Sequence, residues 1–478
     1  MSDSTAKLPL PLFVDLDGTL IKSDLTLESL LALIKQNFFY LLIIPLWLVR
    51  GRAFLKAQLA RRTRIAVEQL PLNREFLAFL ELEKSRGRAM TLISASNQQQ
   101  VSQVSQHLGL FDSAIGSDEN VNLKAGNKLK RIRQLVGDHG FSYAGNSRAD
   151  LPIWAEAEQV IMVNCAIKLG SGLADDKHSI LSFDQPGSTL AALLRAMRPH
   201  QWLKNGLLFL PLILAHQLDQ WQLLLQAGIG FVSFSLCASS VYLLNDMLDL
   251  GSDRAHRQKH KRPFACGELS LTLGIVSMLG LLVGAFLVAL TLPWQFLTVL
   301  LGYWLLTFLY SIYLKRLFLL DVISLALLYT IRIIAGAAAI AVVTTPYLIA
   351  FSLSLFLGLA IVKRVTELSN AMADGLSGIN GRAYGSVHMK ILSKIGGAAS
   401  LIAVAVFALY ISDPATAQLY SSPYILWGIC PLLLYLLIRI WSYAHAGKLD
   451  EDPVLFAITD HLSQAIVILA GVLIWLAT

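Results

Sequence analysis

Nine long apolar runs, separated by short polar connections, occupy the chain from Trp202 to its end. Runs of this length predict membrane-spanning helices, because about 20 apolar residues are needed to cross a hydrocarbon core of ~30 Å. We place the spans at residues 203–218, 224–245, 270–290, 294–313, 319–342, 346–362, 396–412, 423–440 and 461–477. A hydrophobic content of 55% and a charged content of 15% agree with a polytopic membrane protein.

The connections between these runs alternate in charge. Basic residues follow the second, fourth, sixth and eighth spans, whereas the opposite turns, at 219–223, 291–293, 343–345 and 413–422, contain no Lys or Arg. Because cytoplasmic loops are enriched in Lys and Arg, we expect the N-terminal part on the cytoplasmic side of a bacterial inner membrane and the C-terminus outside. The polar first residues, Met1-Ser-Asp-Ser-Thr, argue against a signal peptide.

The first 165 residues have a different pattern, typical of an alternating α/β domain. Short apolar runs predict strands at 8–14, 89–93, 141–144 and 160–163, and polar residues follow the first three. Polar residues at the carboxyl ends of buried parallel strands form the usual site of an open sheet. We therefore expect an α/β Rossmann-like domain at 1–170 with a helical cap at about 24–86, a linker at 171–194, and an all-α polytopic membrane domain at 195–478.

Recognisable polar motifs lie near the first three of these strands. Asp15-Leu-Asp17-Gly-Thr follows the first strand, Ser94 follows the second, and Lys128 precedes the third. The series resembles the haloacid-dehalogenase-type phosphatases. The resemblance implies that Asp15 accepts a phosphoryl group as nucleophile and that Asp17 protonates the leaving oxygen. It also implies that Ser94 hydrogen-bonds the phosphoryl oxygens and that Lys128, or alternatively Lys124, balances their charge.

The fourth motif departs from the family pattern. The family has GDxxxD, whereas this chain has Gly145-Asn146 with Asp150 four residues on. Asn146 keeps a carbonyl oxygen for Mg²⁺ but removes one negative charge. The resemblance implies a Mg²⁺ site at Asp15, Asp17, Asn146 and Asp150. Two alternatives stay open, an active phosphatase and a degenerate or regulatory domain.

Between the first two motifs, an apolar run at 38–49 precedes a group of basic residues. The run is too short to cross a bilayer. It is either a cap helix that lies in the membrane interface, which the basic residues favour, or a helical cap packed on its own core. An interfacial cap would suit a phosphate carried by a lipid. The basic residues are Arg50, Arg52, Lys56, Arg61, Arg62 and Arg64.

The end of the second predicted span carries an acidic cluster and then a basic one. The acidic cluster is Asn245-Asp246-Met-Leu-Asp249-Leu-Gly-Ser-Asp253. On a helix, Asp246, Asp249 and Asp253 stand at i, i+3 and i+7 and share one face. Converging carboxylates beside a basic rim suit Mg²⁺ and a diphosphate; a solvated loop of mixed charge is the alternative. The rim residues are Lys259, Lys261 and Arg262.

An Asp-rich motif within nine spans resembles the UbiA superfamily of intramembrane prenyltransferases. The segment Arg198-Pro-His-Gln-Trp-Leu-Lys204-Asn205 and the run ending Lys261-Arg-Pro-Phe-Ala-Cys-Gly267 are most similar to the branch that contains decaprenyl-phosphate phosphoribosyltransferase. Aromatic prenyltransferases of the superfamily carry a second Asp-rich motif, for which this chain has only Asp321. Basic residues surround that position in the sequence, as expected if both substrates bring phosphates.

The resemblance implies that a polyprenyl phosphate attacks C1 of phosphoribosyl diphosphate and that diphosphate leaves. Asp246, Asp249 and Asp253 would be catalytic and would hold Mg²⁺. For Lys363-Arg364-x-x-Glu367, an anchor with an intrahelical pair is the alternative to phosphate binding. The residues that we expect to bind substrate in this part are Lys204, Asn245, Lys259, Lys261, Arg262, Lys315, Asp321, Arg332, Lys363 and Arg364.

These expectations combine into a bifunctional enzyme, in which the membrane domain makes a phosphoribosyl lipid and the N-terminal domain removes the 5-phosphate. One alternative is a prenyltransferase that uses prenyl diphosphate on an aromatic or other acceptor. The other is that the N-terminal domain is a non-catalytic or regulatory module. Four scattered cysteines predict neither a disulfide framework nor a zinc site. We expect no nucleic-acid partner, and the sequence leaves the oligomeric state open.

Overall fold

The computed structural model describes residues 9–165, 179–184, 187–373, 383–418, 420–449 and 453–478, together with Gly375 and Gly378. The chain divides into two compact units. Unit 1 comprises Met1–Met197 and Tyr242–Met278, and unit 2 comprises Arg198–Val241 and Leu279–Thr478. Residues 1–8, on which the signal-peptide expectation rests, lie outside the described residues, as do 171–178 and 185–186 of the predicted linker.

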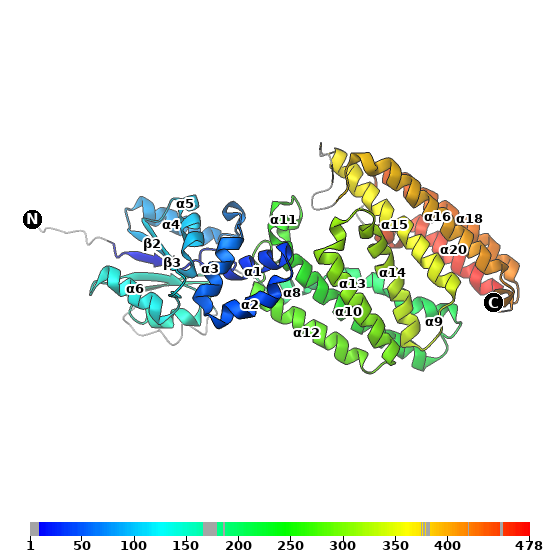
Figure 1. Ribbon diagram of the computed structural model, residues 1–478, viewed down its shortest axis with the longest axis horizontal. Helices are drawn as coiled ribbons and strands as arrows, with labels where there is room; N and C mark the ends of the chain where they lie inside the picture. Colours follow the sequence, from blue (N-terminus) through cyan, green and yellow to red (C-terminus); the bar gives the residue numbers. More distant parts are fainter. Residues whose placement is uncertain are drawn as a thin grey trace, which may run out of the picture. The chain divides into compact units, whose positions relative to one another are not determined.

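Unit 1 contains a parallel six-stranded sheet in the order β3-β2-β1-β4-β5-β6 (Figure 1). The predicted α/β class is therefore confirmed, and β3 and β6 add to the four predicted strands. The strands are β1 (Leu12–Val14), β2 (Met90–Asn97), β3 (Ser113–Ser117), β4 (Ser142–Gly145), β5 (Gln159–Val163) and β6 (Ser179–Phe183).

Helices and short turns of 3₁₀ helix complete unit 1. The α-helices are α1 (Leu25–Gln36), α2 (Tyr40–Val49), α3 (Arg52–Arg62), α4 (Arg74–Ser85), α5 (Gln98–Leu108), α6 (Gly126–Val136), α7 (Leu151–Trp154), α8 (Thr189–Met197) and α11 (Leu250–Ala255). The 3₁₀ helices are η1 (Val67–Gln69), η2 (Arg148–Asp150) and η5 (Lys259–Lys261).

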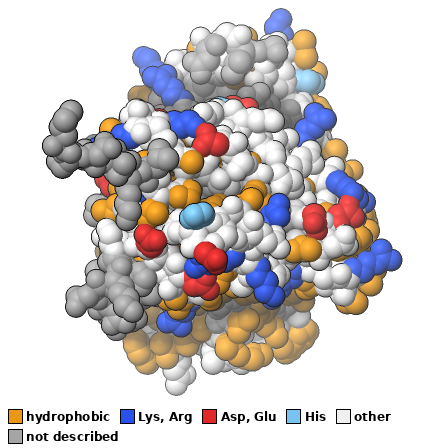
Figure 2. Space-filling model, turned by 90° about the vertical axis from the view of Figure 1, so that its left-hand side faces the viewer, with side chains coloured by type: hydrophobic (Ala, Val, Ile, Leu, Met, Phe, Trp, Pro, Cys, Tyr) orange, Lys and Arg blue, Asp and Glu red, His pale blue; other side chains and the backbone are white. Residues whose placement is uncertain are grey.

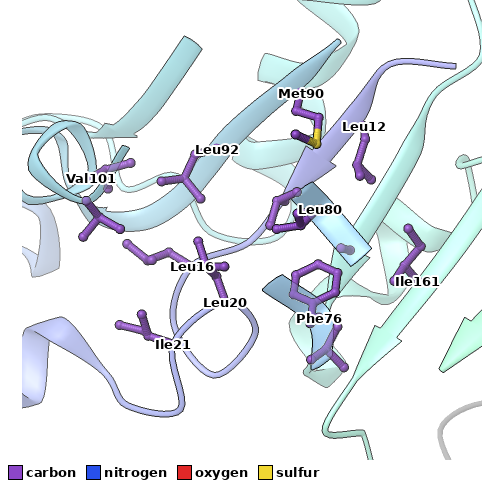
Figure 3. Packing of buried hydrophobic residues seen from close by; sticks show 14 of the residues in the cluster. Leu12, Leu16, Leu20, Ile21, Phe76, Leu80, Met90, Leu92, Val101 and Ile161 are labelled. Atoms are coloured by element: carbon purple, nitrogen blue, oxygen red, sulfur yellow. The ribbon is translucent and has the colours of Figure 1, made fainter. Parts of the chain in front are cut away.

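Helices cover both faces of the sheet, because successive side chains of a strand point to opposite sides. Leu12 of β1 packs with Phe76 of α4 and Val101 of α5 in one buried cluster (Figure 3). Phe13, the next residue, packs in a second cluster with Trp154 of α7. The carboxyl end of β1, where Asp15 follows Val14, is thereby held between two cores.

Most of the remaining helices are long and apolar, and the residues of α10 and α12 are divided between the two units. The α-helices are α9 (Leu210–Leu214), α10 (Trp221–Leu248), α12 (Leu271–Ala289), α13 (Trp294–Ile312), α14 (Leu320–Ala339), α15 (Pro346–Ala373), α16 (Met389–Ser412), α17 (Pro414–Ala417), α18 (Ile429–His445), α19 (Pro453–Thr459) and α20 (His461–Ala477). The 3₁₀ helices are η4 (Pro199–Phe209), η6 (Leu314–Arg316), η7 (Ser386–His388) and η8 (Pro423–Gly428).

Seven helical segments among the described residues are long and apolar enough to cross a membrane: Trp221–Leu248, Leu271–Ala289, Trp294–Ile312, Leu320–Ala339, Pro346–Ala373, Ser386–Ser412 and Pro423–His445. Nine spans are therefore not confirmed. The last expected span is α20, a shorter apolar helix of 17 residues. The first expected span forms η4 and α9, and His216 beyond them has a φ of 53°, which interrupts a right-handed helix.

Within unit 2, α14 packs against α13, α15 and η4, and α15 packs against α16 and α18. Gly336 of α14 permits the close approach of η4, because a Cβ at this position would lie 2.0 Å from the carbonyl oxygen of Leu208. This approach places the polar residues of η4 beside the buried face of α14.

Candidate active sites

The first motif of the phosphatase-like site lies in the loop after β1. The amide of Asp15 donates to the carbonyl oxygen of Ala144 in β4, at 2.9 Å. Gly18 has a φ of 76°, and a Cβ there would lie 2.0 Å from Nδ2 of Asn146. The glycine therefore lets the side chain of the fourth-motif Asn146 lie against the first-motif loop.

Lys128 connects the first motif to the fourth. Its Nζ lies 2.9 Å from Oδ1 of Asp15 and 3.9 Å from Oδ1 of Asp150. It also donates to the hydroxyl of Tyr143 at 2.9 Å, and that hydroxyl donates to Asp150 at 2.8 Å. The structure thus brings together Asp15, Lys128 and Asp150, as the motif series predicts. Tyr143 was not predicted, because a tyrosine within a buried strand usually serves packing.

Asp150 is itself held by its own loop. It is buried, and its Oδ2 accepts hydrogen bonds from the amide of Asn146 at 3.2 Å and from the amide and hydroxyl of Ser147, both at 3.0 Å. Both carboxylate oxygens therefore have protein partners. In this arrangement Asp150 shapes the fourth-motif loop and orients Tyr143 and Lys128.

Asp17 is bound by two serines from the end of β2. Its Oδ2 accepts from Ser94 at 3.0 Å and from Ser96 at 2.6 Å, and its Oδ1 accepts from the amide of Leu25 at 2.8 Å. Ser94 was predicted for this site, whereas Ser96 was missed. The two-residue period of a strand, which puts both serines on one face, is the signal that identifies Ser96.

Burial raises the pKa of both motif carboxyls. Desolvation, opposed by Lys128, raises the pKa of Asp15 to about 6. Desolvation, reinforced by the negative charge of Asp24, raises the pKa of Asp17 to about 7. Two buried carboxyls that are costly to ionise fit a cation site, so Asp15, Asp17 and Asn146 would hold Mg²⁺. When bound, the ion would supply positive charge for the phosphoryl oxygens.

The acidic cluster, residues 245–253, forms an Asp-rich segment that continues the helical hydrogen bonding of α10. Although α10 ends at Leu248, the amide of Asp249 donates to the carbonyl oxygen of Asn245 at 2.9 Å. The amide of Asp253 likewise donates to the carbonyl oxygen of Asp249 at 2.8 Å. The helical spacing that the sequence predicts is therefore retained across the junction with α11.

Basic side chains engage all three carboxylates. Arg262 Nη1 lies 3.2 Å from Oδ1 of Asp246 and 2.7 Å from Oδ2 of Asp253, so these two carboxylates converge on one guanidinium. Asp249 pairs instead with Lys35 of α1, with 2.7 Å between Nζ and Oδ1. Burial raises the pKa of Asp253, although Arg262 opposes the shift. The predicted rim residue Arg262 thus lies directly on the acidic cluster.

The cluster has the donor set of a divalent-cation site. Oδ1 of Asn245 is buried and has no hydrogen-bond partner among the described residues. A buried acceptor of this kind fits a cation ligand, so Asn245, Asp246, Asp249 and Asp253 would hold Mg²⁺ through oxygen. Within the described part of the chain, no group of three or more His, Cys, Asp or Glu side chains is arranged so that it could hold a metal ion. In this structure Arg262 and Lys35 supply the positive charge that balances the three carboxylates. Of the other rim residues, Lys259 is partly exposed and Lys261 is exposed.

Helix α1 links the Asp-rich segment to the phosphatase-like site within unit 1. It begins at Leu25, whose amide binds Asp17. One turn further on, Glu28 binds Arg254 through two hydrogen bonds of 2.9 and 2.7 Å, and both side chains are almost fully buried. Near its end, Lys35 binds Asp249. Sequence reasoning missed Glu28 and Lys35, because charges on a cap helix are usually solvated.

In unit 2, Arg332 of α14 lies in a buried polar and aromatic cluster. Its Nε donates to Oδ1 of Asn205 at 2.9 Å, and its guanidinium lies 5.3 Å from the ring of Tyr303 and 5.4 Å from the ring of Tyr329. Lys204 Nζ lies 5.8 Å from the Tyr329 ring. The structure therefore places the predicted residues Lys204 and Arg332 around Tyr329.

A second buried group in unit 2 contains Asp321 and Arg364. Arg364 is fully buried, binds Asp321 through two of its nitrogens, and donates to Oε2 of Glu367 at 2.6 Å. Tyr310 also donates to Asp321, at 3.0 Å. The intrahelical pair of Arg364 with Glu367 is thus present, and the guanidinium has carboxylate partners on two sides. The predicted Lys315 and Lys363 are partly exposed, in η6 and α15.

Comparisons with known proteins identify the families of both parts of the chain. A sequence profile of the UbiA prenyltransferase family matches residues 207–476, and one of haloacid dehalogenase-like hydrolases matches residues 12–154. Protein y4nM of Sinorhizobium fredii is 35% identical over 462 residues, which cover 95% of this chain and 88% of that protein. Nodulation protein NoeC of Azorhizobium caulinodans is 33% identical over 55% of this chain and 86% of its own. Decaprenyl-phosphate phosphoribosyltransferase of Mycobacterium tuberculosis is 27% identical over a match that covers 61% of this chain and 94% of that protein.

Loss of the Glu28–Arg254 pair should destabilise the protein. Glu28→Ala leaves Arg254 buried without its carboxylate, which costs about 3–5 kcal/mol. Arg195→Ala is the matched control, since it removes the exposed ion pair with Glu268 and should cost less than about 1 kcal/mol. Denaturant unfolding of the full chain in detergent measures both. Equally small changes in the two variants would contradict the structural role of the buried pair.

The raised pKa of Asp17 predicts a pH effect on stability without divalent cations. The folded chain, with a pKa of about 7, binds the Asp17 proton more tightly than the unfolded chain, with 3.8. The resulting stabilisation is complete below about pH 4 and is lost as the pH rises through about 7. In EDTA, the melting temperature of the wild type should therefore fall more than that of Asp17→Asn as the pH rises from 5 to 8. Parallel curves for the two proteins would refute the assignment.

Proposed function

The chain belongs to the UbiA prenyltransferase family and carries a haloacid dehalogenase-like hydrolase domain at its N-terminus, and on this basis we propose that it is a bifunctional membrane enzyme. The membrane domain transfers 5-phosphoribose from phosphoribosyl diphosphate to a polyprenyl phosphate. The N-terminal domain then removes the 5-phosphate from the lipid product. The observation that carries this proposal is that α1 contacts both Asp17 and the Asp-rich segment.

Two features favour a sugar-phosphate donor over a prenyl diphosphate with an aromatic acceptor. The relative that covers the membrane domain over 94% of its own length is named as a phosphoribosyltransferase. In addition, Asp321, which stands where a second Asp-rich motif would lie, is neutralised by Arg364. The relatives of higher identity, y4nM and NoeC, have names that specify no substrate.

The transfer requires little acid–base chemistry from the protein. The phosphate oxygen of the lipid is already an anion, so it forms the new bond to C1 without losing a proton, while the bond from C1 to diphosphate breaks. Arg262, with Lys259 and Lys261, would bind the phosphates of the donor. Mg²⁺ held at the Asp-rich segment would neutralise the leaving diphosphate.

The dephosphorylation uses the first-motif carboxylates. An oxygen of Asp15 attacks phosphorus, the bond to the ribose oxygen breaks, and Asp17 gives that oxygen a proton. Water then hydrolyses the acyl phosphate and returns a proton to Asp17, and inorganic phosphate leaves. Lys128 balances the charge at Asp15. Burial raises the pKa of Asp17, which favours the protonated carboxyl that must give the ribose oxygen its proton.

We also place the enzyme in a bacterial inner membrane with the N-terminal domain in the cytoplasm and the C-terminus outside. The alternation of loops rich in Lys and Arg with loops that lack them supports this orientation. Phosphoribosyl diphosphate is a soluble and highly charged donor, so a cytoplasmic site gives it access without crossing the membrane.

Product analysis with two variants tests the proposal. Wild type, given phosphoribosyl diphosphate, a polyprenyl phosphate and Mg²⁺, should make a ribosyl lipid detectable by mass spectrometry. Asp15→Asn should slow dephosphorylation by about 10³-fold or more and accumulate the 5-phosphorylated lipid. Asp246→Asn should make neither product, yet still hydrolyse p-nitrophenyl phosphate.

Identical product patterns in wild type and Asp15→Asn would refute a coupled dephosphorylation. Release of diphosphate from a prenyl diphosphate and an aromatic acceptor, with none from phosphoribosyl diphosphate, would replace the proposed donor with a prenyl donor.

A further inference from the structure

Helix α2 exposes an apolar surface of unusual extent. All ten of its residues, Tyr40–Val49, are apolar or aromatic, and none is buried. Leu42 is 74% exposed, Leu46 65% and Val49 87%. Phe39, directly before the helix, is 70% exposed. A cap helix packed on its own core would bury such side chains, so the structure excludes that interpretation for α2 and leaves its outer surface to be explained.

One narrow face holds α2 to the rest of unit 1. Tyr40, Ile44 and Trp47, at i, i+4 and i+7, are its less exposed residues. The rings of Tyr40 and Trp47 lie 5.8 Å apart, and the guanidinium of Arg62 in α3 lies 4.9 Å from the Trp47 ring. The helix is therefore anchored through this face, and its leucines point away from it.

The sequence around α2 carries basic side chains and no acidic ones. No Asp or Glu occurs between residues 37 and 67. Five arginines follow the helix, at positions 50, 52, 61, 62 and 64. On the face drawn in Figure 2, by contrast, basic and acidic side chains are interspersed, as on an ordinary water-facing surface. Arg61 pairs with Glu119, whereas the charges that flank α2 in sequence are all basic. An apolar helix with basic flanks is complementary to an anionic lipid interface.

We propose that α2 docks the phosphatase-like domain on the membrane, with its leucines in the interface and the arginines at anionic phospholipid headgroups. A ten-residue helix is about 15 Å long and cannot cross the bilayer, so it lies in the interface, where Tyr and Trp are also favoured. The same chain contains seven candidate spans, which keep a bilayer within reach. If the proposed function holds, this contact presents a lipid-carried phosphomonoester to Asp15.

Lipid quenching in the full-length protein tests the docking directly. Leu46→Cys is labelled with a fluorophore in a background with Cys266→Ser and Cys430→Ser, and the protein is placed in nanodiscs that contain anionic phospholipid with nitroxide near the headgroup. The matched control is Leu135→Cys on α6, an exposed leucine of the same domain. We expect strong quenching at position 46 and little at position 135. Equal, weak quenching at both would overturn the proposal.

Two further outcomes separate this inference from other occupants and from the proposed function. Fluorescence at position 46 that changes with protein concentration, but not with nitroxide lipid, would assign α2 to a second copy of the chain and reject docking. Leu42→Glu with Leu46→Glu should slow dephosphorylation of the phosphoribosyl lipid about tenfold more than hydrolysis of p-nitrophenyl phosphate. An equal effect on both substrates would reject a role in lipid presentation, while the quenching result stands without any knowledge of the substrate.

Discussion

The buried ion pair between Glu28 and Arg254 is the interaction on which the arrangement of unit 1 depends. Taking two charges out of water is costly, and a close pair with two hydrogen bonds offsets that cost only if both partners stay in place. Glu28 lies one turn from Leu25, whose amide binds Asp17, and Arg254 lies directly after Asp253. The pair therefore fixes the position of the Asp-rich segment relative to the phosphatase-like site.

The same principle governs the buried charges of unit 2. Arg364 is fully buried, and it is bound by Asp321 from α14 and by Glu367 from its own helix. Arg332 is surrounded by Asn205 and by aromatic rings that attract its cation. Such charges are tolerated in a membrane helix only when they face polar or aromatic partners. They give the membrane domain a polar interior next to helices whose outer surfaces are apolar.

Local sequence patterns predicted strands and motifs, but they could not predict ion pairs between residues that are far apart in the sequence. Asp15, Ser94, Lys128 and Asp150 were predicted because the motifs that contain them resemble those of the haloacid-dehalogenase-type phosphatases. Strand β3, Ser113–Ser117, was missed because it contains few large apolar residues. The first expected span is not confirmed: it forms η4 and α9, and a positive φ at His216 follows α9, a backbone feature that composition does not reveal. The Glu28–Arg254 pair joins residues 226 positions apart, and no single-sequence pattern specifies such a partner.

The central claim is that one chain performs transfer and then dephosphorylation on the same ribose. A time course with phosphoribosyl diphosphate labelled with ³²P at the 5-position and with ¹⁴C in the ribose tests it most directly. Both labels should enter the lipid fraction together, after which ³²P should leave as inorganic phosphate while ¹⁴C stays on the lipid. Release of ³²P without any lipid-bound ¹⁴C, or permanent retention of both labels by the wild-type enzyme, would contradict the account.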